Sequence, residues 1–204
     1  MSASSIISIS SAALDCIQLN PLGKYLDWCP DFRNFFLSDP GQEHYKLLAL
    51  IASQIPSGHT ISDVGMYRGS SALALSFNEN IKVVTYDIEN VIPQDALSIF
   101  ARSNVEVKLM RGQDDIAAIC KSDVVVLDID PHDGPSETEF VNLLIENNFR
   151  GLLVCDDIHI NEGMRTFWNT IPSHLKKVDV TQYGHWSGTG IVVFDPQTID
   201  ITIE

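Results

Sequence analysis

The sequence is poor in basic residues, and this scarcity argues against one class of partner. It has 13 lysines and arginines against 27 aspartates and glutamates, and its 204 residues carry a formal net charge of −14. An acidic surface repels phosphates, so a nucleic-acid partner would require a local basic patch. The nearest approach to one is Arg102, Lys108 and Arg111, interrupted or flanked by Glu106, Asp114 and Asp115. We therefore expect no nucleic-acid partner.

Metal-binding cysteine pairs and long apolar runs are also missing. None of the four cysteines stands in a CxxC spacing, which argues against a zinc site and against a disulfide framework. No apolar run approaches the roughly 18 residues that a membrane span needs. The apolar first residues lack the early basic residues of a signal peptide. We expect a cytoplasmic protein without a membrane partner, and the sequence leaves its oligomeric state open, a homodimer included.

A regular alternation of strand and helix patterns runs through most of the chain. Apolar, strand-like runs that are each followed by a helical pattern occupy residues 60–64, 82–87, 105–110, 123–128 and 151–155. Such alternation predicts parallel strands with crossover helices, and the unbroken apolar runs predict a sheet covered on both faces. The last two runs, residues 177–183 and 190–194, leave no room for a helix between them and should pair antiparallel. We predict an α/β fold with a doubly wound, seven-stranded, mostly parallel sheet that ends in this hairpin.

The chain shows no linker and no repeat, so we assign one domain to residues 41–204, which opens with a helical pattern up to residue 55. Residues 1–40 form a separate N-terminal segment that we expect to be largely helical, with many aromatics between Gly23 and Phe36. Two roles remain open for this segment. It covers the ligand site as a lid, or it simply packs on the domain.

The most informative motif follows the first predicted strand. That strand ends at Asp63, and Gly65 and Gly69, four residues apart, let the backbone bend tightly and lie close to a ligand. Ser70 and Ser71 then stand where the N-terminus of a helix favours an anionic ligand group. The next strand ends at Asp87, where a carboxylate suits the hydroxyls of a ribose. The motif predicts a nucleotide-like ligand.

The loop is similar to the acid-x-Gly-x-Tyr-x-Gly-x-Ser form of small-molecule O-methyltransferases. Over about residues 41–195 the chain resembles the class I S-adenosylmethionine-dependent methyltransferases, which have a Rossmann-like sheet, and in particular the catechol and caffeoyl-coenzyme A enzymes. The resemblance implies that S-adenosylmethionine is the cofactor. It places the following residues around the cofactor: Asp63, Gly65, Tyr67, Gly69 and Ser71 at the methionine portion, Asp87 at the ribose, and Gln113 and Asp114 near the adenine.

Acidic residues also follow the fourth and fifth predicted strands. The carboxyl ends of parallel strands share one edge of a sheet, so Asp128, Asp130, Asp156 and Asp157 should lie near one another. Crowded carboxylates favour a divalent cation, and oxygen ligands suit Mg²⁺, Ca²⁺ or Mn²⁺. In the catechol-type enzymes an acid and an Asp-Asn pair at these positions bind magnesium, which implies Asp128, Asp156 and Asp157 as metal ligands. The alternative is that these acids are helix caps and loop anchors without a metal.

The lysine base of the catechol-type enzymes is absent, and Pro131-His132-Asp133 stands in its place. The run from Asp128 to His132 resembles the Asp-x-Asp-His segment of a broader methyltransferase group. In that interpretation His132 acts as the general base beside Asp128, because histidine titrates near neutrality. The alternative is a histidine in a surface loop. His44 has no supporting context in the sequence.

We therefore expect an enzyme that transfers a methyl group from S-adenosylmethionine to a hydroxyl of a small molecule, assisted by a divalent cation, most simply Mg²⁺. A second hypothesis is a cofactor-binding scaffold or regulatory protein without methyl transfer. A third is a metal-dependent hydroxylase on a related fold, with His132, Asp130 and His159 as its metal ligands. His185 and Trp186, in the hairpin turn, form either a wall of the acceptor site or a packed closure of the hairpin.

Overall fold

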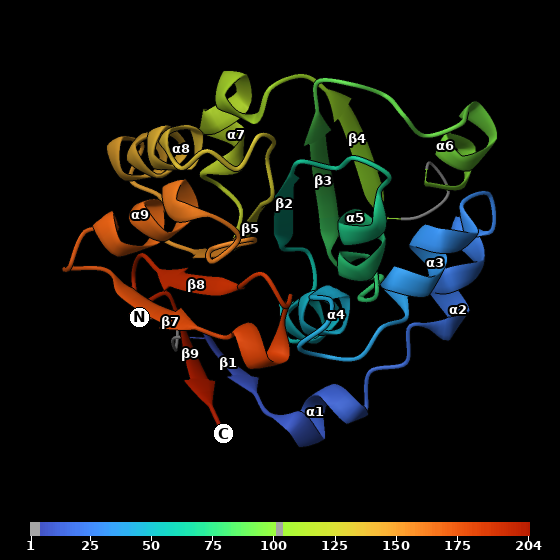
Figure 1. Ribbon diagram of the computed structural model, residues 1–204, viewed down its shortest axis with the longest axis horizontal. Coiled ribbons are helices and arrows are strands. Elements are labelled where there is room, and N and C mark those ends of the chain that lie inside the picture. Colours follow the sequence, from blue (N-terminus) through green and yellow to red (C-terminus); the bar gives the residue numbers. More distant parts are fainter. Residues whose placement is uncertain (1–4, 101–103) are drawn as a thin grey trace.

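A seven-stranded sheet forms the centre of the molecule (Figure 1). The computed structural model describes residues 5–100 and 104–204. The strands, in their order across the sheet, are β4 (Val105–Leu109), β3 (Lys82–Asp87), β2 (Thr60–Val64), β5 (Val124–Leu127), β6 (Leu152–Cys155), β8 (Gly190–Val193) and β7 (Lys176–Asp179). The strands β2 to β6 pair in parallel, and β8 is antiparallel to both of its neighbours. The predicted fold class, including the antiparallel hairpin, is confirmed.

Helices cover both faces of this sheet and create two separate hydrophobic cores (Figure 1). One core involves α4 (Tyr45–Ser53), α5 (Ser70–Leu75) and α6 (Gln94–Phe100), and the other α7 (Ile116–Ile119), α8 (Pro135–Glu146) and α9 (Glu162–Thr170). Successive strand residues serve opposite cores: Val124 packs in the first and Val125 in the second. The period of two along a strand therefore explains why both positions are apolar.

The N-terminal segment contains a strand that the sequence analysis did not predict. Strand β1 (Ser5–Ile9) pairs in parallel with β9 (Ile199–Ile203), and the two lie side by side at the bottom of Figure 1. Ile7 and Ile9 are fully buried in the first core, whereas Ile6 is exposed. The segment continues through the short helices α1 (Ser11–Asp15), α2 (Asn20–Gly23), η1 (Lys24–Leu26) and α3 (Pro30–Phe36).

Most predicted elements are present with shifted ends. The helical pattern after the third predicted strand forms the 3-10 turn η2 (Gly112–Asp115) and α7, and the first hairpin strand ends at Asp179, before η3 (Thr181–Tyr183). Among the helices of the described residues, none has the length and apolar character needed to traverse a bilayer.

Candidate functional site

The carboxyl ends of the central strands are in register at one edge of the sheet. Val64 of β2 pairs with Tyr86 of β3 and with Leu127 of β5, and Leu127 pairs in turn with Cys155 of β6. The residues that follow these four positions are Gly65, Asp87, Asp128 and Asp156. The register therefore brings the glycine loop and the strand-end acids together, as the parallel sheet predicted.

The glycine loop adopts a conformation that requires glycine at its first position. Gly65 has φ +102°, and a Cβ atom there would lie 1.6 Å from the carbonyl oxygen of Asp128. No side chain fits such a gap, so strand packing already explains this glycine. Gly69, with φ +81°, precedes α5. Between them, Tyr67 has φ +43°, and its backbone N–H donates to Asp87 Oδ2 over 2.7 Å.

Asp63 lies beneath the loop, fully buried. Its Oδ2 accepts hydrogen bonds from Ser71 Oγ at 3.0 Å and Thr85 Oγ1 at 2.7 Å, while its Oδ1 has no hydrogen-bond partner. Burial raises the pKa of this carboxyl to about 6, against the opposing effect of the two hydroxyl donors. The side chain thus holds the start of α5 against β3. It does not line the cavities described below, so its placement at the methionine portion of the cofactor stays a prediction.

We expect Asp63→Asn to change how stability depends on pH. The folded-state pKa of about 6 lies above the ordinary value of 3.8, so the contribution of Asp63 to stability is full below pH 3.8 and is lost as the pH rises through 6. The difference corresponds to about 3 kcal/mol. Between pH 4 and pH 7 the wild type should lose about 2.4 kcal/mol of unfolding free energy through this group, and urea unfolding of the variant should not show this loss. Asp130→Asn, at a 95% exposed side chain, is the control, and identical pH dependence in Asp63→Asn and wild type would contradict the assignment.

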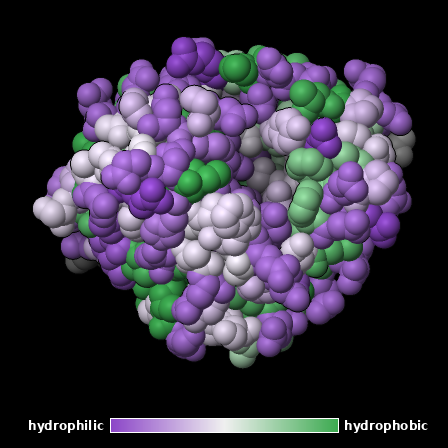
Figure 2. Space-filling view, in the orientation of Figure 1, coloured by the Kyte–Doolittle hydropathy of each residue, from purple (hydrophilic) through white to green (hydrophobic). Residues whose placement is uncertain are grey.

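A cavity of about 770 Å³, here called the strand-end cavity, opens at this edge. Figure 2 shows a hollow near the middle of the face, beside the end of β2 in the matching view of Figure 1. The predicted site residues that line the cavity are Gly65, Tyr67, Asp87, Gln113, Asp128 and His132. Asp114 is exposed and is not among the lining residues, so its placement near an adenine stays a prediction.

A smaller cavity of about 280 Å³, here called the α3 cavity, adjoins the first one. The two share Gly65, Tyr67 and Asp128. Ser71, the last predicted residue of the loop, lines the α3 cavity, as do Phe32 and Phe35 of α3. The N-terminal segment therefore contributes a wall to the site.

The wall is held by contacts between α3 and the glycine loop. The Phe32 ring lies 5.5 Å from the Tyr67 ring, and the Arg68 guanidinium stacks over Phe32 at 4.4 Å. Arg68 also donates to Cys29 Sγ at 2.8 Å. Whether α3 opens as a lid stays a prediction. A third, shallower groove of about 790 Å³ lies between α8 and α9, and none of the predicted site residues lines it.

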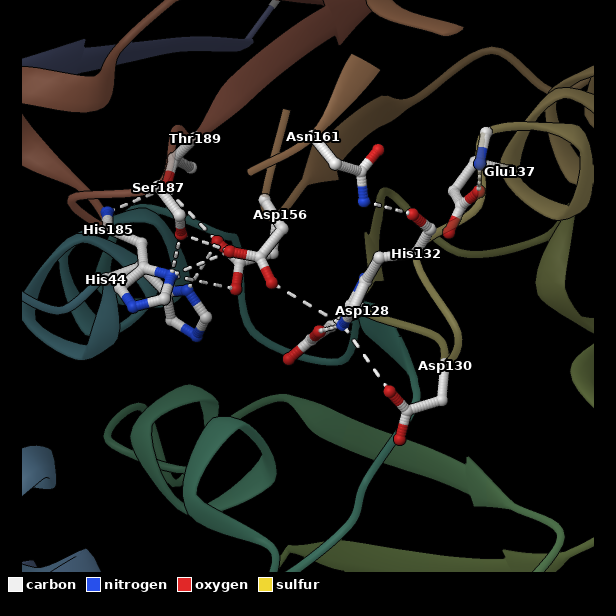
Figure 3. A network of polar contacts seen from close by, with 12 residues as sticks. His44, Asp128, Asp130, His132, Glu137, Asp156, Asn161, His185, Ser187 and Thr189 are labelled. Carbon is white, nitrogen blue, oxygen red and sulfur yellow. Dashed lines mark hydrogen bonds and ion pairs between the residues drawn. The ribbon is translucent and has the colours of Figure 1, made fainter. Parts of the chain in front are cut away.

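The strand-end acids divide into two groups, each with histidine (Figure 3). In the first group, His132 Nε2 lies 3.4 Å from Asp157 Oδ2 and 3.7 Å from both Asp128 Oδ1 and Asp130 Oδ1. Burial raises the pKa of Asp128 well above its usual value, and the negative charge of Asp156 adds to this effect. Asp128, His132 and Asp157 offer ligand atoms that lie within 4.8 Å of one another.

The second group places Asp156 between two histidines. Its Oδ1 is 3.0 Å from His44 Nδ1, and its Oδ2 is 3.5 Å from His185 Nδ1. Burial lowers the pKa of both histidines, but the carboxylates outweigh it and raise the pKa of His44 to about 9 and that of His185 to about 10. Burial alone would raise the pKa of Asp156, but the contacts with His44 and His185 outweigh it and hold that pKa well below its usual value.

The three acids predicted as metal ligands fall in two adjoining groups, which Asp157 Oδ1 connects through His185 Nδ1 at 3.1 Å. Asp128 and Asp157 share a group with His132, whereas Asp156 belongs to a group with His44 and His185. The sequence analysis gave His44 no role because the residue precedes α4, far from any strand end, and only the packing of α4 on the sheet brings it here. His185 was recognised, but as a wall residue. His159 pairs with Asp179 at 2.7 Å and belongs to neither group.

No protein-family model and no curated protein matches the sequence. A solved methyltransferase from Geobacter sulfurreducens is 17% identical, with a TM-score of 0.60 over 90% of this chain and 94% of that one. The O-methyltransferase from Bacillus cereus in complex with SAH is 18% identical, with a TM-score of 0.58 over 87% of this chain and 92% of that one.

A candidate caffeoyl-CoA O-methyltransferase from Staphylococcus aureus is 12% identical, with a TM-score of 0.57 over 74% of this chain and 82% of that one. At such identities the likeness concerns the fold. The strand order of the sheet, with its antiparallel β8 inserted between β6 and β7, agrees with these similarities. The chain has the fold of the class I S-adenosylmethionine-dependent methyltransferases.

Proposed function

We propose that the protein transfers a methyl group from S-adenosylmethionine to a hydroxyl of a small molecule. The observation that carries this proposal is the junction of the two cavities: the strand-end cavity, with Asp87 on its wall, meets the α3 cavity at Asp128. A cofactor in the first cavity would thus face an acceptor in the second. The similar fold of the Bacillus cereus O-methyltransferase supports the same assignment.

The residues of the strand-end cavity suit the chemistry of this cofactor. Asp87 already accepts backbone N–H groups from Tyr67 and Glu89, one on each oxygen, and each carboxylate oxygen retains capacity for a ribose hydroxyl. Val64, Tyr86 and Met110 offer apolar surface for a base. The acidic lining, including Glu89, Asp128 and Asp130, attracts the positive sulfonium.

The cofactor supplies an activated methyl group, so the chain has to position the acceptor and take its proton. Asp87 and the loop at Gly65 hold the nucleoside. We assign the proton to His132, which lines the strand-end cavity and lies 3.7 Å from Asp128 at the junction with the α3 cavity. The ring of Phe32 and the Arg68 guanidinium over it form part of the wall of the α3 cavity.

A divalent cation would be held by Asp128 and Asp157, two oxygen ligands of the kind that Mg²⁺ prefers. Such an ion lowers the pKa of an acceptor hydroxyl and orients it. Asp156, the third predicted ligand, has each oxygen near a histidine of the second group. Asp157 has one oxygen near His132 and the other 3.1 Å from His185 Nδ1. The metal part of the proposal thus rests on Asp128 and Asp157, with His132 beside them.

The direct test combines cofactor binding with transfer of a labelled methyl group. Calorimetry should detect S-adenosylmethionine binding, and labelled cofactor should then give labelled product from at least one member of a panel of phenols, sugars and hydroxy acids. Binding without any labelled product across the panel would favour the scaffold hypothesis. Absence of binding would refute the proposal.

Once an acceptor is found, we expect methyl transfer to fall at least about tenfold in excess chelator and to return when Mg²⁺ is added, since a bound cation contributes several kcal/mol to such reactions. Cofactor affinity, measured in the same chelator, should stay close to its starting value because Asp87 and the glycine loop need no metal. Full turnover in excess chelator would reject the metal part of the proposal and leave the cofactor assignment intact.

A further inference from the structure

Three side chains from distant parts of the sequence meet beside the α3 cavity. His44 precedes α4, Asp156 follows β6, and His185 lies in the connection between η3 and β8. Figure 3 shows the two imidazoles on one side of the polar network, turned toward Asp156. All three residues line the α3 cavity.

The spacing of their ligand atoms matches that of groups that share one metal ion. Bonds of about 2.1 Å to a common ion place neighbouring ligand atoms about 3.0 Å apart in an octahedron and about 3.4 Å apart in a tetrahedron. The observed separations are 3.0 Å from His44 Nδ1 to Asp156 Oδ1 and 3.5 Å from His185 Nδ1 to Asp156 Oδ2. His185 Nδ1 also lies 2.6 Å from Ser187 Oγ and 3.1 Å from Asp157 Oδ1, contacts that a bound ion would replace.

The surroundings of the three residues offer one candidate outer partner, near His185. Histidine ligands usually direct their second ring nitrogen to a carboxylate or carbonyl, which fixes the tautomer. His185 Nε2 lies 3.7 Å from Glu43 Oε1, and Thr189 Oγ1 donates to Asp156 Oδ1 at 3.4 Å. His44 and Asp156 are 4% and 6% exposed, so their positions are fixed by packing. Within the described residues, His44 Nε2 has no hydrogen-bond partner, so Nδ1 is its engaged nitrogen.

We propose that His44, Asp156 and His185 form a binding site for a divalent transition-metal ion, such as Co²⁺, Fe²⁺, Mn²⁺ or Zn²⁺. Two imidazole nitrogens favour these ions over Mg²⁺, which prefers oxygen ligands. Three protein ligands leave coordination positions free, and the α3 cavity gives a small oxygen ligand access to them. The site adjoins the oxygen site at Asp128 and Asp157, because Asp157 Oδ1 lies 3.1 Å from His185 Nδ1. The inference does not depend on methyl transfer.

The test uses Co²⁺, whose visible absorption reports its ligands, added to full-length protein that has been stripped with chelator and dialysed. We expect saturable binding of Co²⁺ that a large excess of Mg²⁺ does not displace. His185→Gln should weaken this binding by about 100-fold or more, because even the loss of an outer partner of a metal ligand costs 10- to 100-fold. His44→Gln should weaken Co²⁺ binding to a similar extent.

The matched control is His59→Gln, which removes another carboxylate-paired histidine, 2.8 Å from Asp123 and outside both cavities. It should bind Co²⁺ as the wild type does. His132→Gln should also retain the Co²⁺ spectrum. Loss of binding in His132→Gln but not in His185→Gln would move the ion to the other group and overturn the proposal.

The melting temperature with and without Co²⁺ distinguishes a variant that has lost the site from one that fails to fold. An ion that binds only the folded state raises the melting temperature by mass action. Co²⁺ should therefore raise the Tm of the wild type and of His59→Gln, and leave that of His185→Gln unchanged. Absence of both a Co²⁺ spectrum and a Tm shift in the wild type would refute the site. Since neither readout involves S-adenosylmethionine, that failure would leave the proposed methyl transfer untouched.

Discussion

Asp87→Ala is expected to weaken binding of S-adenosylmethionine by about 100-fold. The proposed ribose contacts are two hydrogen bonds to a charged carboxylate, each worth about 1.5–3 kcal/mol, and a loss of about 3 kcal/mol corresponds to that factor. Asp87 is the residue at the end of β3 that lines the strand-end cavity, and its side chain is held by the backbone N–H of Tyr67 at 2.7 Å and of Glu89 at 3.0 Å. Calorimetry with purified protein measures the change.

The matched control is Glu89→Gln, which removes a neighbouring negative charge on the same cavity wall. If Asp87 acts by direct contact, this control should change the affinity by less than about threefold, because exposed charges are well screened. A comparable loss in both variants would instead assign the effect to general attraction of the sulfonium. Wild-type affinity in Asp87→Ala would end the assignment of Asp87 to the ribose.

Asp87 has a second role that the experiment must separate. Its Oδ2 accepts the N–H of Tyr67, a residue with φ +43°, so its removal also loosens the glycine loop. Asp87→Asn keeps an oxygen that can accept this N–H but removes the charge. We expect a melting temperature close to the wild type for Asp87→Asn, together with a loss of affinity nearly as large as that of Asp87→Ala.

The sheet and its loop were predictable because their signals are local. Val124 and Val125 are apolar together since each faces a different core, and that pattern is visible in five residues of sequence. Parallel strands bring their carboxyl ends to one edge of the sheet, so the sequence alone places Asp87 and Asp128 at the same edge.

The parts that escaped prediction depend on distant contacts. Strand β1 pairs with β9, about 190 residues away along the chain, and nothing in its Ser-Ile sequence specifies a parallel partner. His44 reaches Asp156 only because α4 packs on the sheet. The strand ends gave the positions of Asp156 and Asp157 but not the directions of their side chains, and it is those directions that divide the predicted metal ligands into two groups.

His132→Asn should lower kcat for methyl transfer by about 10²- to 10⁴-fold, the usual contribution of a positioned general base. Asparagine is the appropriate replacement because His132 has φ +53°, a backbone conformation that asparagine adopts more readily than most residues. The loop should stay in place, since Asn161 Nδ2 donates to the backbone oxygen of residue 132 at 2.8 Å. Cofactor affinity should therefore change by less than about threefold.

The control is His159→Asn, a partly exposed histidine that pairs with Asp179 and lines neither cavity. Its kcat should equal that of the wild type. If His132 serves only as a proton acceptor, free imidazole added to His132→Asn should restore part of the rate, because the space of the ring is open to the strand-end cavity. A lost rate without rescue, combined with a changed Mg²⁺ requirement, would assign His132 to the ion held by Asp128 and Asp157. An unchanged kcat would make His132 an ordinary loop residue, and the acceptor hydroxyl, its pKa lowered by the metal, would lose its proton to water.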